Sequence, residues 1–175
     1  MVTYDPTITD SQYGFSYEYG VDIEIAGQWQ PIRRITAVDP QVQPVTQDAA
    51  TYDDKGSPNA PKIGESWTLA FQVQQQRLPD GKFTEEVEAL LALTEPDAVG
   101  ELAAGKFRWY DKPAEGTPNP DHAFEGVGTV QVNRAQTGND QIGSWAVSIT
   151  GRGRRTKIAN PFTGWAPATP EVPEG

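Results

Sequence analysis

The sequence predicts a mainly β protein, an antiparallel β-sandwich or partly closed barrel with one flanking α-helix. Three observations predict this fold class. Apolar and polar side chains alternate along residues 15–25, 65–77 and 144–150, and a period of two is typical of strands with one buried face. Turn-forming residues separate these segments, and residues 84–95 follow helical spacing. Sheets that alternate in this way are mostly antiparallel.

The first predicted strand, residues 15–25, has two contrasting faces. One face carries aromatic and β-branched side chains, and the other carries the carboxylates of Glu18, Asp22 and Glu24. Successive side chains of a strand point to opposite sides of the sheet, so the apolar face is expected in the core and the acidic face toward water. The acidic face has two interpretations: the ordinary solvated side of a sheet, or an acidic wall with a function.

Further strands are expected along the rest of the chain. Residues 65–77 place Trp67 and Phe71 on one apolar face, and residues 144–150 do the same with Trp145. Residues 137–143 are rich in turn formers, so the last two strands are expected to form a hairpin. The shorter strand candidates are residues 29–32, 35–38, 107–110 and 127–134.

One amphipathic helix is expected over residues 84–95. Thr84 can cap it, Glu85 and Glu86 suit the positive end of the helix dipole, and Pro96 ends it. A single short helix between strands most simply covers one open edge or end of the sheets. Its apolar stripe is therefore expected to pack on the core.

The remaining segments lack the pattern of core elements. Residues 40–64 contain four prolines among polar and charged residues, in a loop far longer than the usual length of about four to six residues. Residues 111–122 form a second excursion. The expected organisation is an N-terminal arm over residues 1–13, one β domain over residues 14–158, and a Pro-rich C-terminal arm over residues 159–175.

A basic cluster precedes the C-terminal arm. It holds four of the 14 basic residues of the chain, Arg152, Arg154, Arg155 and Lys157. The cluster is either a solvated strand end or a docking patch for an acidic neighbour.

Composition excludes several classes of function. The 175 residues include no Cys, which removes disulfides, thiolate nucleophiles and thiolate metal sites and favours folding in a reducing cytoplasm. The net charge of −10 disfavours tight binding to nucleic acid. No segment has the roughly 18 apolar residues of a membrane span, and the start lacks the pattern of a signal peptide.

The sequence contains no specific catalytic, cofactor or metal motif. His122 is the only histidine, so a site with two histidines cannot form within one chain. The glycines at 126–128 and 151–153 lack the strand-to-helix context of a phosphate loop. The carboxylate pairs at 53–54 and 85–86 are sequence neighbours and do not converge across a cleft. The expectation is a protein that is not an enzyme and holds no cofactor or metal.

The order of the parts resembles a major tail tube protein of long-tailed (siphovirus-type) bacteriophages, a family related in fold to the tube protein of type VI secretion. The resemblance covers about residues 13–158. It rests on the long two-faced strand, the long polar loop, one helix between strands and a closing hairpin that ends in Thr150-Gly151. The 46–71 stretch, which joins the polar loop to the second long strand, matches the same order.

The resemblance implies a virion protein, made in the host cytoplasm, that forms hexameric rings stacked into a hollow tail tube. DNA would pass through the lumen without specific binding, and the other partners would be the terminator, tape-measure and distal tail proteins, with no membrane. Edge-to-edge joining of six sheets would pair their exposed strands. Glu18, Asp22 and Glu24 would then line the lumen. The inter-subunit loop 40–64 would contribute Asp48, Tyr52, Asp53, Asp54 and Lys55, and the basic cluster would dock on the next ring.

Other functions stay open from the residues alone. A carbohydrate-binding β-sandwich would use two or three exposed coplanar aromatic rings, for which Trp29, Tyr110 and Trp165 are the candidates. A tail terminator or other ring-forming tail component would share the fold and stop at one ring. A carboxylate hydrolase is the enzymatic alternative, and its nucleophile, base and electrophilic stabiliser are not assembled in the sequence.

Overall fold

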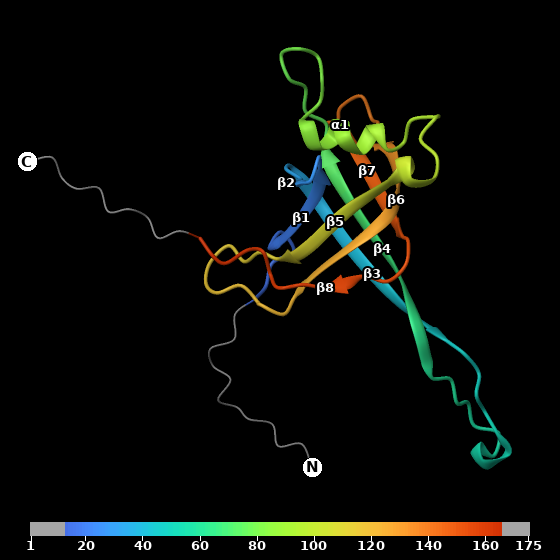
Figure 1. The fold of residues 1–175 in the computed structure, drawn as a ribbon. Coiled ribbons are helices and arrows are strands. Elements are labelled where there is room, and N and C mark those ends of the chain that lie inside the picture. The colour runs from blue at the N-terminus through green and yellow to red at the C-terminus, as the bar shows by residue number, and fades with distance from the viewer. Residues whose placement is uncertain (1–12, 166–175) are drawn as a thin grey trace, which may run out of the picture.

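The computed structural model describes residues 13–165, which form one antiparallel sheet of eight strands and a single α-helix (Figure 1). The helix is α1 (Glu85–Ala92), and two short 3₁₀ helices are η1 (Tyr52–Asp54) and η2 (Gly100–Ala103). The strands are β1 (Tyr19–Ile25), β2 (Gln28–Pro31), β3 (Ile35–Thr46), β4 (Lys62–Gln74), β5 (Ala104–Asp111), β6 (Ala123–Ala135), β7 (Ser144–Gly151) and β8 (Thr156–Lys157).

The sheet follows the order β2-β1-β5-β6-β7-β4-β3, and β8 pairs with the first part of β6, at Phe124 and Glu125. All pairings are antiparallel. The sheet is curled but not closed, so β2 and β3 form its two edges. The mainly β fold class and the closing hairpin, β6–β7, are confirmed.

The core lies on the inner side of the curled sheet. Trp67, Leu69, Phe71 and Val73 on β4 are all at most 3% exposed, which confirms the apolar register predicted for this strand. They pack against buried residues of the other long strands and of α1: Val21, Ile23, Val87, Leu90, Phe107, Trp109, Val130, Val147 and Ile149. Helix α1 lies across one end of the curled sheet (Figure 1) and inserts its apolar stripe there.

The first strand is shorter than predicted. Residues 15–18 are not in β1, and Phe15 and Tyr17 are 56% and 70% exposed, with their rings stacked at 5.4 Å. The pairing of β1 with β5 ends where Tyr19 faces Asp111, so the residues before Tyr19 have no neighbouring strand against which to form a ladder. The aromatic alternation continues past the point where the sheet stops.

The segment predicted as a loop over residues 40–64 is largely a long hairpin. β3 continues through Pro40 and Pro44 to Thr46, and β4 already begins at Lys62. Proline lacks a backbone N–H, but it is tolerated on an edge strand because the missing donor can face away from the partner strand. The connecting segment is therefore residues 47–61, which include η1.

The predicted helix is confirmed, with a shorter extent. Thr84 occupies the N-cap position, but its side chain makes no capping bond. Glu88 Oε1 instead accepts a hydrogen bond from the backbone N–H of Phe83 at 2.9 Å. No helix within residues 13–165 has the length and apolar character needed to cross a membrane.

The first part of the predicted C-terminal arm is packed on the body. Asn160 Nδ2 donates hydrogen bonds to the carbonyl oxygens of Asp111 and Asn119, each at 2.9 Å, and Trp165 Nε1 donates to the carbonyl of Pro113 at 2.9 Å. Residues 160–165 thus cover the 111–122 excursion. The rest of the two predicted arms, residues 1–12 and 166–175, lies outside the described residues.

Candidate functional site

The outer face of the sheet is the side of β3, β4, β6 and β7 that points away from the core. The register places Thr68 and Ala70 of β4 beside Thr150 and Ser148 of β7. Asp39 is a charged position on this face. The other neighbouring positions carry small or uncharged polar side chains: Gln41, Gln72, Thr129, Gln131 and Ala146. Small or uncharged polar side chains therefore dominate a broad surface of a chain whose net charge is −10.

Asp22 does not face water as the alternation predicted. It is 3% exposed, and its carboxylate accepts hydrogen bonds from Arg108 Nε at 2.7 Å and from the Tyr110 hydroxyl at 3.0 Å. The Arg108 guanidinium also lies over the Trp29 ring, 4.5 Å from its centroid. Long side chains from β5 and β2 fold over the outer side of β1, and Gly20 leaves space for the Tyr110 ring. Burial and the charge of Asp22 raise the pKa of Tyr110.

The other two carboxylates of the predicted acidic face have different surroundings. Glu18 is half-buried and accepts hydrogen bonds from the backbone N–H groups of Phe15 and Ala114, each at 2.9 Å. Glu24 is half-buried and makes no ion pair with another described residue. The three carboxylates thus do not form one continuous solvated wall in the single chain, and their place on a lumen stays a prediction.

The arm, residues 42–66, is the part of the β3–β4 hairpin that projects beyond the end of β7 (Figure 1). Its apolar side chains are exposed: Tyr52 fully, Ile63 at 63%, Val45 at 44% and Val42 at 38%. Burying such surface against another molecule would contribute roughly 25 cal/mol per Å². The arm therefore carries apolar surface that the chain itself does not cover.

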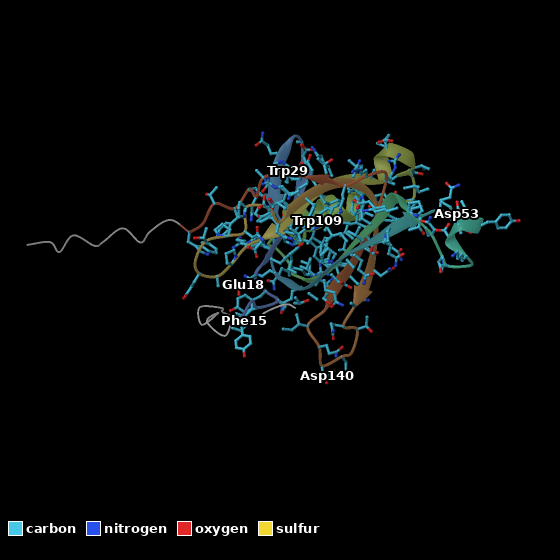
Figure 2. All side chains as sticks on the ribbon, turned by 90° about the horizontal axis from the view of Figure 1, so that it is seen from below. Phe15, Glu18, Trp29, Asp53, Trp109 and Asp140 are labelled. Atoms are coloured by element: carbon cyan, nitrogen blue, oxygen red, sulfur yellow. The ribbon has the colours of Figure 1, made fainter. Side chains whose placement is uncertain are left out.

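The tip of the arm has a defined local structure. Thr51 donates from its backbone N–H and its hydroxyl to Asp54 Oδ2, at 2.7 and 3.1 Å, and the backbone bond lowers the pKa of Asp54. Asp48 accepts from the N–H of Ala50 at 2.9 Å. Asp53 has no such contact among the described residues and lies at the outer end of the arm (Figure 2). The loop residues predicted to meet another subunit are thus held together on an exposed tip.

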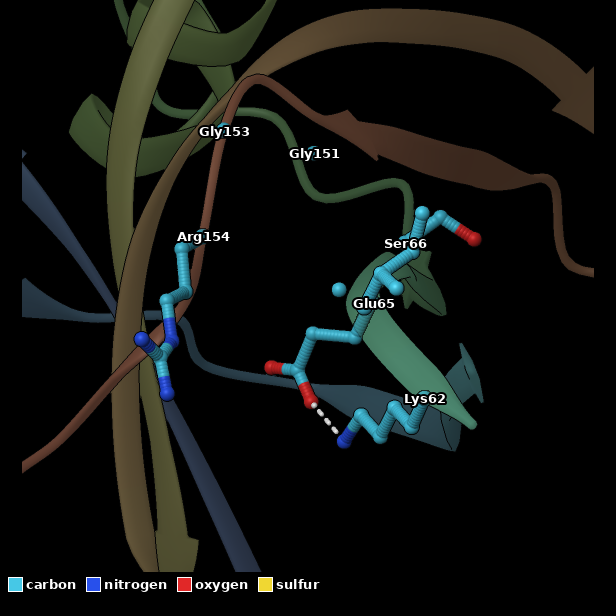
Figure 3. A pocket seen from close by; sticks show the side chains of 8 residues that line it. Lys62, Glu65, Ser66, Gly151, Gly153 and Arg154 are labelled. Atoms are coloured by element: carbon cyan, nitrogen blue, oxygen red, sulfur yellow. Dashed lines mark hydrogen bonds and ion pairs between the residues drawn. The ribbon is translucent and has the colours of Figure 1, made fainter. Parts of the chain in front are cut away.

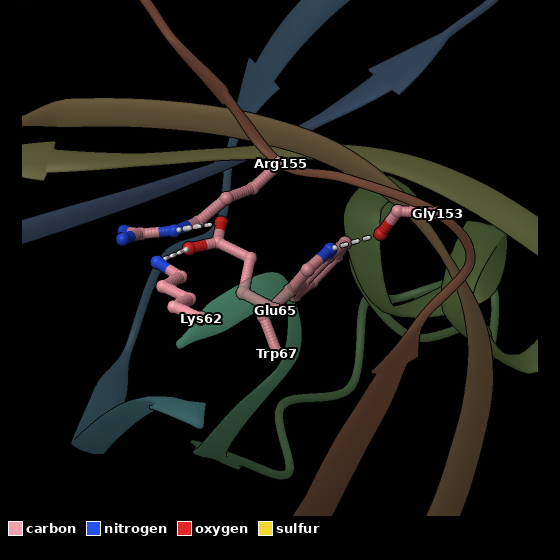
Figure 4. A network of polar contacts seen from close by, with 5 residues as sticks. All are labelled: Lys62, Glu65, Trp67, Gly153 and Arg155. Atoms are coloured by element: carbon pink, nitrogen blue, oxygen red, sulfur yellow. Dashed lines mark hydrogen bonds and ion pairs between the residues drawn. The ribbon is translucent and has the colours of Figure 1, made fainter. Parts of the chain in front are cut away.

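A polar network fixes the base of the arm (Figure 4). Glu65 accepts from Arg155 Nε at 2.9 Å and from Lys62 Nζ at 3.2 Å, and Arg155 holds the pKa of Glu65 below its ordinary value. Trp67 Nε1 donates to the carbonyl of Gly153 at 3.1 Å. The network ties the first part of β4 to the segment between β7 and β8.

Most of the predicted basic docking cluster is paired within the chain. Arg152 bonds Glu101 at 2.8 Å, Arg155 bonds Glu65, and Lys157 lies 3.9 Å from Asp121. Arg154 alone has no carboxylate partner among the described residues, and it lines a cavity of about 570 Å³ at the base of the arm (Figure 3). A docking role for this cluster stays a prediction.

The aromatic platform of the carbohydrate-binding alternative is not formed. Tyr110 is 6% exposed, Trp29 is covered by Arg108 and Lys106, and Trp165 donates to the Pro113 carbonyl. These residues serve the packing of the outer side of β1, β2 and β5 and the docking of residues 160–165.

The described residues contain no group of three or more His, Cys, Asp or Glu that could hold a metal ion. His122 lies beside Tyr19, with Nε2 3.4 Å from the tyrosine hydroxyl. Burial, together with the charge of Asp111, raises the pKa of Tyr19 to about 12, so this hydroxyl stays protonated at neutral pH. The pair is a hydrogen-bonded contact near the end of the sheet.

Sequence reasoning missed Arg108, the partner of Asp22. The signal was present in the period of two, because the predicted strand at 107–110 turns Arg108 and Tyr110 to the outer side. The period of two does not show that β1 pairs with β5, and this pairing aligns Asp22 with Arg108. Strand pairing over 86 residues of sequence is not encoded in local periodicity.

No protein-family model matches the sequence, and no curated protein matches it. Solved structures do match its fold. One is a chain of the tail of an empty gene transfer agent particle with C6 symmetry, with a TM-score of 0.61 and 12% identity over 85% of this chain and 100% of that chain. Another comes from the virion of the native gene transfer agent particle, with a TM-score of 0.60, 10% identity and the same coverage.

A third similar structure is a chain of the baseplate of the anti-feeding prophage in a 6-fold symmetrised reconstruction. It has a TM-score of 0.52 and 7% identity over 87% of this chain and 99% of that chain. Each match spans nearly the whole of the other chain, so the likeness covers a complete subunit. The chain therefore has a tail-tube-like fold, shared with subunits of phage-like tail and baseplate assemblies.

Proposed function

We propose that this chain is a structural virion protein that assembles into hexameric rings, which stack into a hollow tail tube for DNA passage. The observation that carries the proposal is the fold, which matches complete chains from a tail with C6 symmetry. The two open sheet edges and the projecting arm support it, because both present surface that a neighbouring copy would cover.

The outer face is the proposed wall of the bore. It lies on four adjacent strands, β6, β7, β4 and β3, and small uncharged side chains give a passing duplex no cation to bind. On the neighbouring strands, Lys106 lies 3.9 Å from Glu125 and Arg108 binds Asp22. Within residues 13–165, Glu24 and Asp39 form no ion pair with a cation, and they would repel phosphate. In this proposal Asp22 holds the wall together rather than repelling DNA.

The arm is the proposed contact between copies. Its exposed Tyr52 and Ile63 supply apolar surface, and the tip residues Asp48, Asp53, Asp54 and Lys55 supply charge. Terminator, tape-measure and distal tail proteins would meet the ends or the interior of the tube. The protein would be made in the host cytoplasm and reside in the virion tail, without catalytic activity.

A ring-forming tail component that stops at one ring is the second candidate. The likeness to a baseplate chain favours it. The two candidates share the hexameric ring and differ in whether rings stack.

Negative-stain electron microscopy of the purified chain over a concentration series, with light scattering to give mass, tests both. Hollow tubes are the result expected for a tube subunit, and single rings at every concentration would indicate the second candidate. A strict monomer at every concentration would contradict both.

Replacing residues 47–61 by a two-residue Asn-Gly turn tests the role of the arm. The body should fold, since all the buried core residues lie outside this segment, and tube formation should be lost. Shortening the β6–β7 loop, residues 136–143, is the matched control and should leave assembly intact. Normal tubes from the arm variant would contradict the proposed contact.

A further inference from the structure

We propose that the arm tip of one copy docks, through Asp53, in a cationic cavity at the β1–β2 edge of another copy. This inference rests on the proposed assembly of copies and names the surface that receives the arm. It is carried by two groups of charges that find no opposite charge within the described chain.

The cavity has a volume of about 410 Å³ and is lined by the first part of β1, by residues 31–34, and by Tyr110 and Lys112. Arg33 and Arg34 are exposed, and neither they nor Lys112 form an ion pair with a described carboxylate. Asp22 is the one carboxylate that lines the cavity, and it is already bound by Arg108 and Tyr110. The cavity thus has three uncompensated positive charges.

The three cations are held on a fixed frame. Ile32, next to Arg33, is 6% exposed, and its backbone N–H donates to the Val21 carbonyl at 2.9 Å. The carbonyl of Arg34 accepts from the N–H of Gln74 at 3.0 Å. Lys112 Nζ lies over the rings of Phe162 and Trp165, at 5.7 and 5.4 Å. A rim of three cations in a chain of net charge −10 favours an acidic partner, because charge complementarity selects partners and register.

The arm tip is the acidic surface that fits this cavity. Asp54 and Asp48 are occupied by local hydrogen bonds, and Asp53 is exposed without a contact among the described residues. Tyr52 beside it is fully exposed, and tyrosine is enriched in protein interfaces and among the residues that contribute most to binding. Asp53 would enter the cavity and Tyr52 would pack on its rim.

The contact has to form between copies. The cavity residues 31–34 lead into the first residue of β3, whereas the arm tip lies beyond the last residue of that strand. The 12 residues of β3 alone span roughly 40 Å. Asp53 and Trp29, which belongs to β2, lie on opposite sides of the molecule (Figure 2). A contact between two different surfaces of identical chains is heterologous, so it propagates from copy to copy and can build a ring or a stack.

Cysteine cross-linking tests this contact directly, because the chain has no Cys. Full-length S57C and P31C variants place a thiol beside the arm tip and on the cavity lining, and they leave Asp53 and Arg33 in place. They are mixed, treated with a short bismaleimide, and analysed by mass spectrometry of the linked peptides. We expect a 57–31 link well above any link from D140C to P31C, since Asp140 is an exposed acidic position on the β6–β7 loop (Figure 2). A 57–31 link no more abundant than the 140–31 link would overturn the proposal.

Charge reversal gives the energetic test. D53K alone and R33E alone should each raise the concentration needed for assembly by about tenfold, the effect of losing roughly 1.4 kcal/mol. A mixture of the two variants, or the double variant, should recover assembly. R134E, at an exposed arginine near the end of β6, is the matched control and should have no effect. The contact would be overturned if D53K and R33E each assembled like the wild type. It would also be overturned if combining the two substitutions failed to restore assembly.

These results separate the inference from the proposed function. If the D53K and R33E variants form tubes at the same protein concentration as the wild type, the docking contact is refuted and the tube assignment stays intact. A specific 57–31 link in a protein that forms no rings or tubes would support the contact and refute the tube.

Discussion

β4 contains two halves with the same alternation and opposite surroundings. In the body, Trp67, Leu69 and Phe71 point inward and are at most 3% exposed. In the arm, Ile63 has the same parity and is 63% exposed. The body half is flanked by β3 and β7, whereas the arm half pairs only with β3.

The same pattern of residues can therefore stabilise the monomer or remain exposed until another molecule covers it. A strand gains stability from its apolar face only where other elements cover that face. Substitutions in the body half should therefore change the free energy of unfolding, and those in the arm half should change assembly.

The largest contrast is expected between L69A and I63A. Leu69 is fully buried, so L69A should lower the free energy of unfolding by about 3 to 4 kcal/mol through lost burial and a cavity. I63A should change it by less than about 0.5 kcal/mol. Urea denaturation of both variants measures the difference, and equal losses would show that the arm is covered in the monomer.

The next contrast compares two carboxylates on the same face of β1. D22A should cost about 2 to 3 kcal/mol, because it leaves Arg108 and the Tyr110 hydroxyl without their acceptor. E24A, which removes a carboxylate without an ion pair, should stay within about 0.5 kcal/mol. Thermal and urea unfolding check both values. A neutral D22A would mean that the cluster is compensated by water.

A smaller contrast is expected between two glycines, Gly151 at the end of β7 and Gly64 in the arm. A Cβ at Gly151 would overlap the Trp67 indole, whereas at Gly64 its nearest neighbour is Val45 Cβ at 3.9 Å. G151A should therefore cost about 1 to 2 kcal/mol by overpacking, and G64A should be tolerated. Unfolding curves of the two variants test this, and the added variant W67F should reduce the cost of G151A if the clash is its cause.

The smallest effect concerns the network that joins arm and body. Arg155 holds the pKa of Glu65 below its ordinary value near 4.5, so the folded state favours the ionised carboxylate. This stabilisation is present above the unfolded pKa and is lost as the pH falls through the folded pKa. E65Q should therefore flatten the dependence of the urea midpoint on pH below about 4.5. If the urea midpoint of E65Q depended on pH as in the wild type, other carboxylates would cause that dependence. E24Q is the control and should leave the dependence unchanged.

Local patterns account for the elements that the sequence predicted well. The alternation of β4 and β7 and the helical spacing of α1 are properties of neighbouring residues, and the structure confirms these elements with shifted ends. Periodicity reports which side chains share a face, and therefore predicted the mainly β class and the buried Trp67.

The acidic face of β1 shows where local patterns fail. The sequence placed Asp22 on the face opposite the core, which is correct, but that face is covered by Arg108, Tyr110 and Trp29 from other strands. The prolines of β3 show the same limit, because they fit a strand only if it lies at an edge of the sheet.

Residue types and their spacing are sufficient to predict the fold class, the inward register of the long strands, the helix and the acidic charge. The folded chain was needed to show which strands are edges, where β1 begins, what covers Asp22, and which basic residues pair with a carboxylate. Strand pairing and side-chain coverage join residues far apart in the chain, such as Asp22 and Arg108, so no local pattern specifies them.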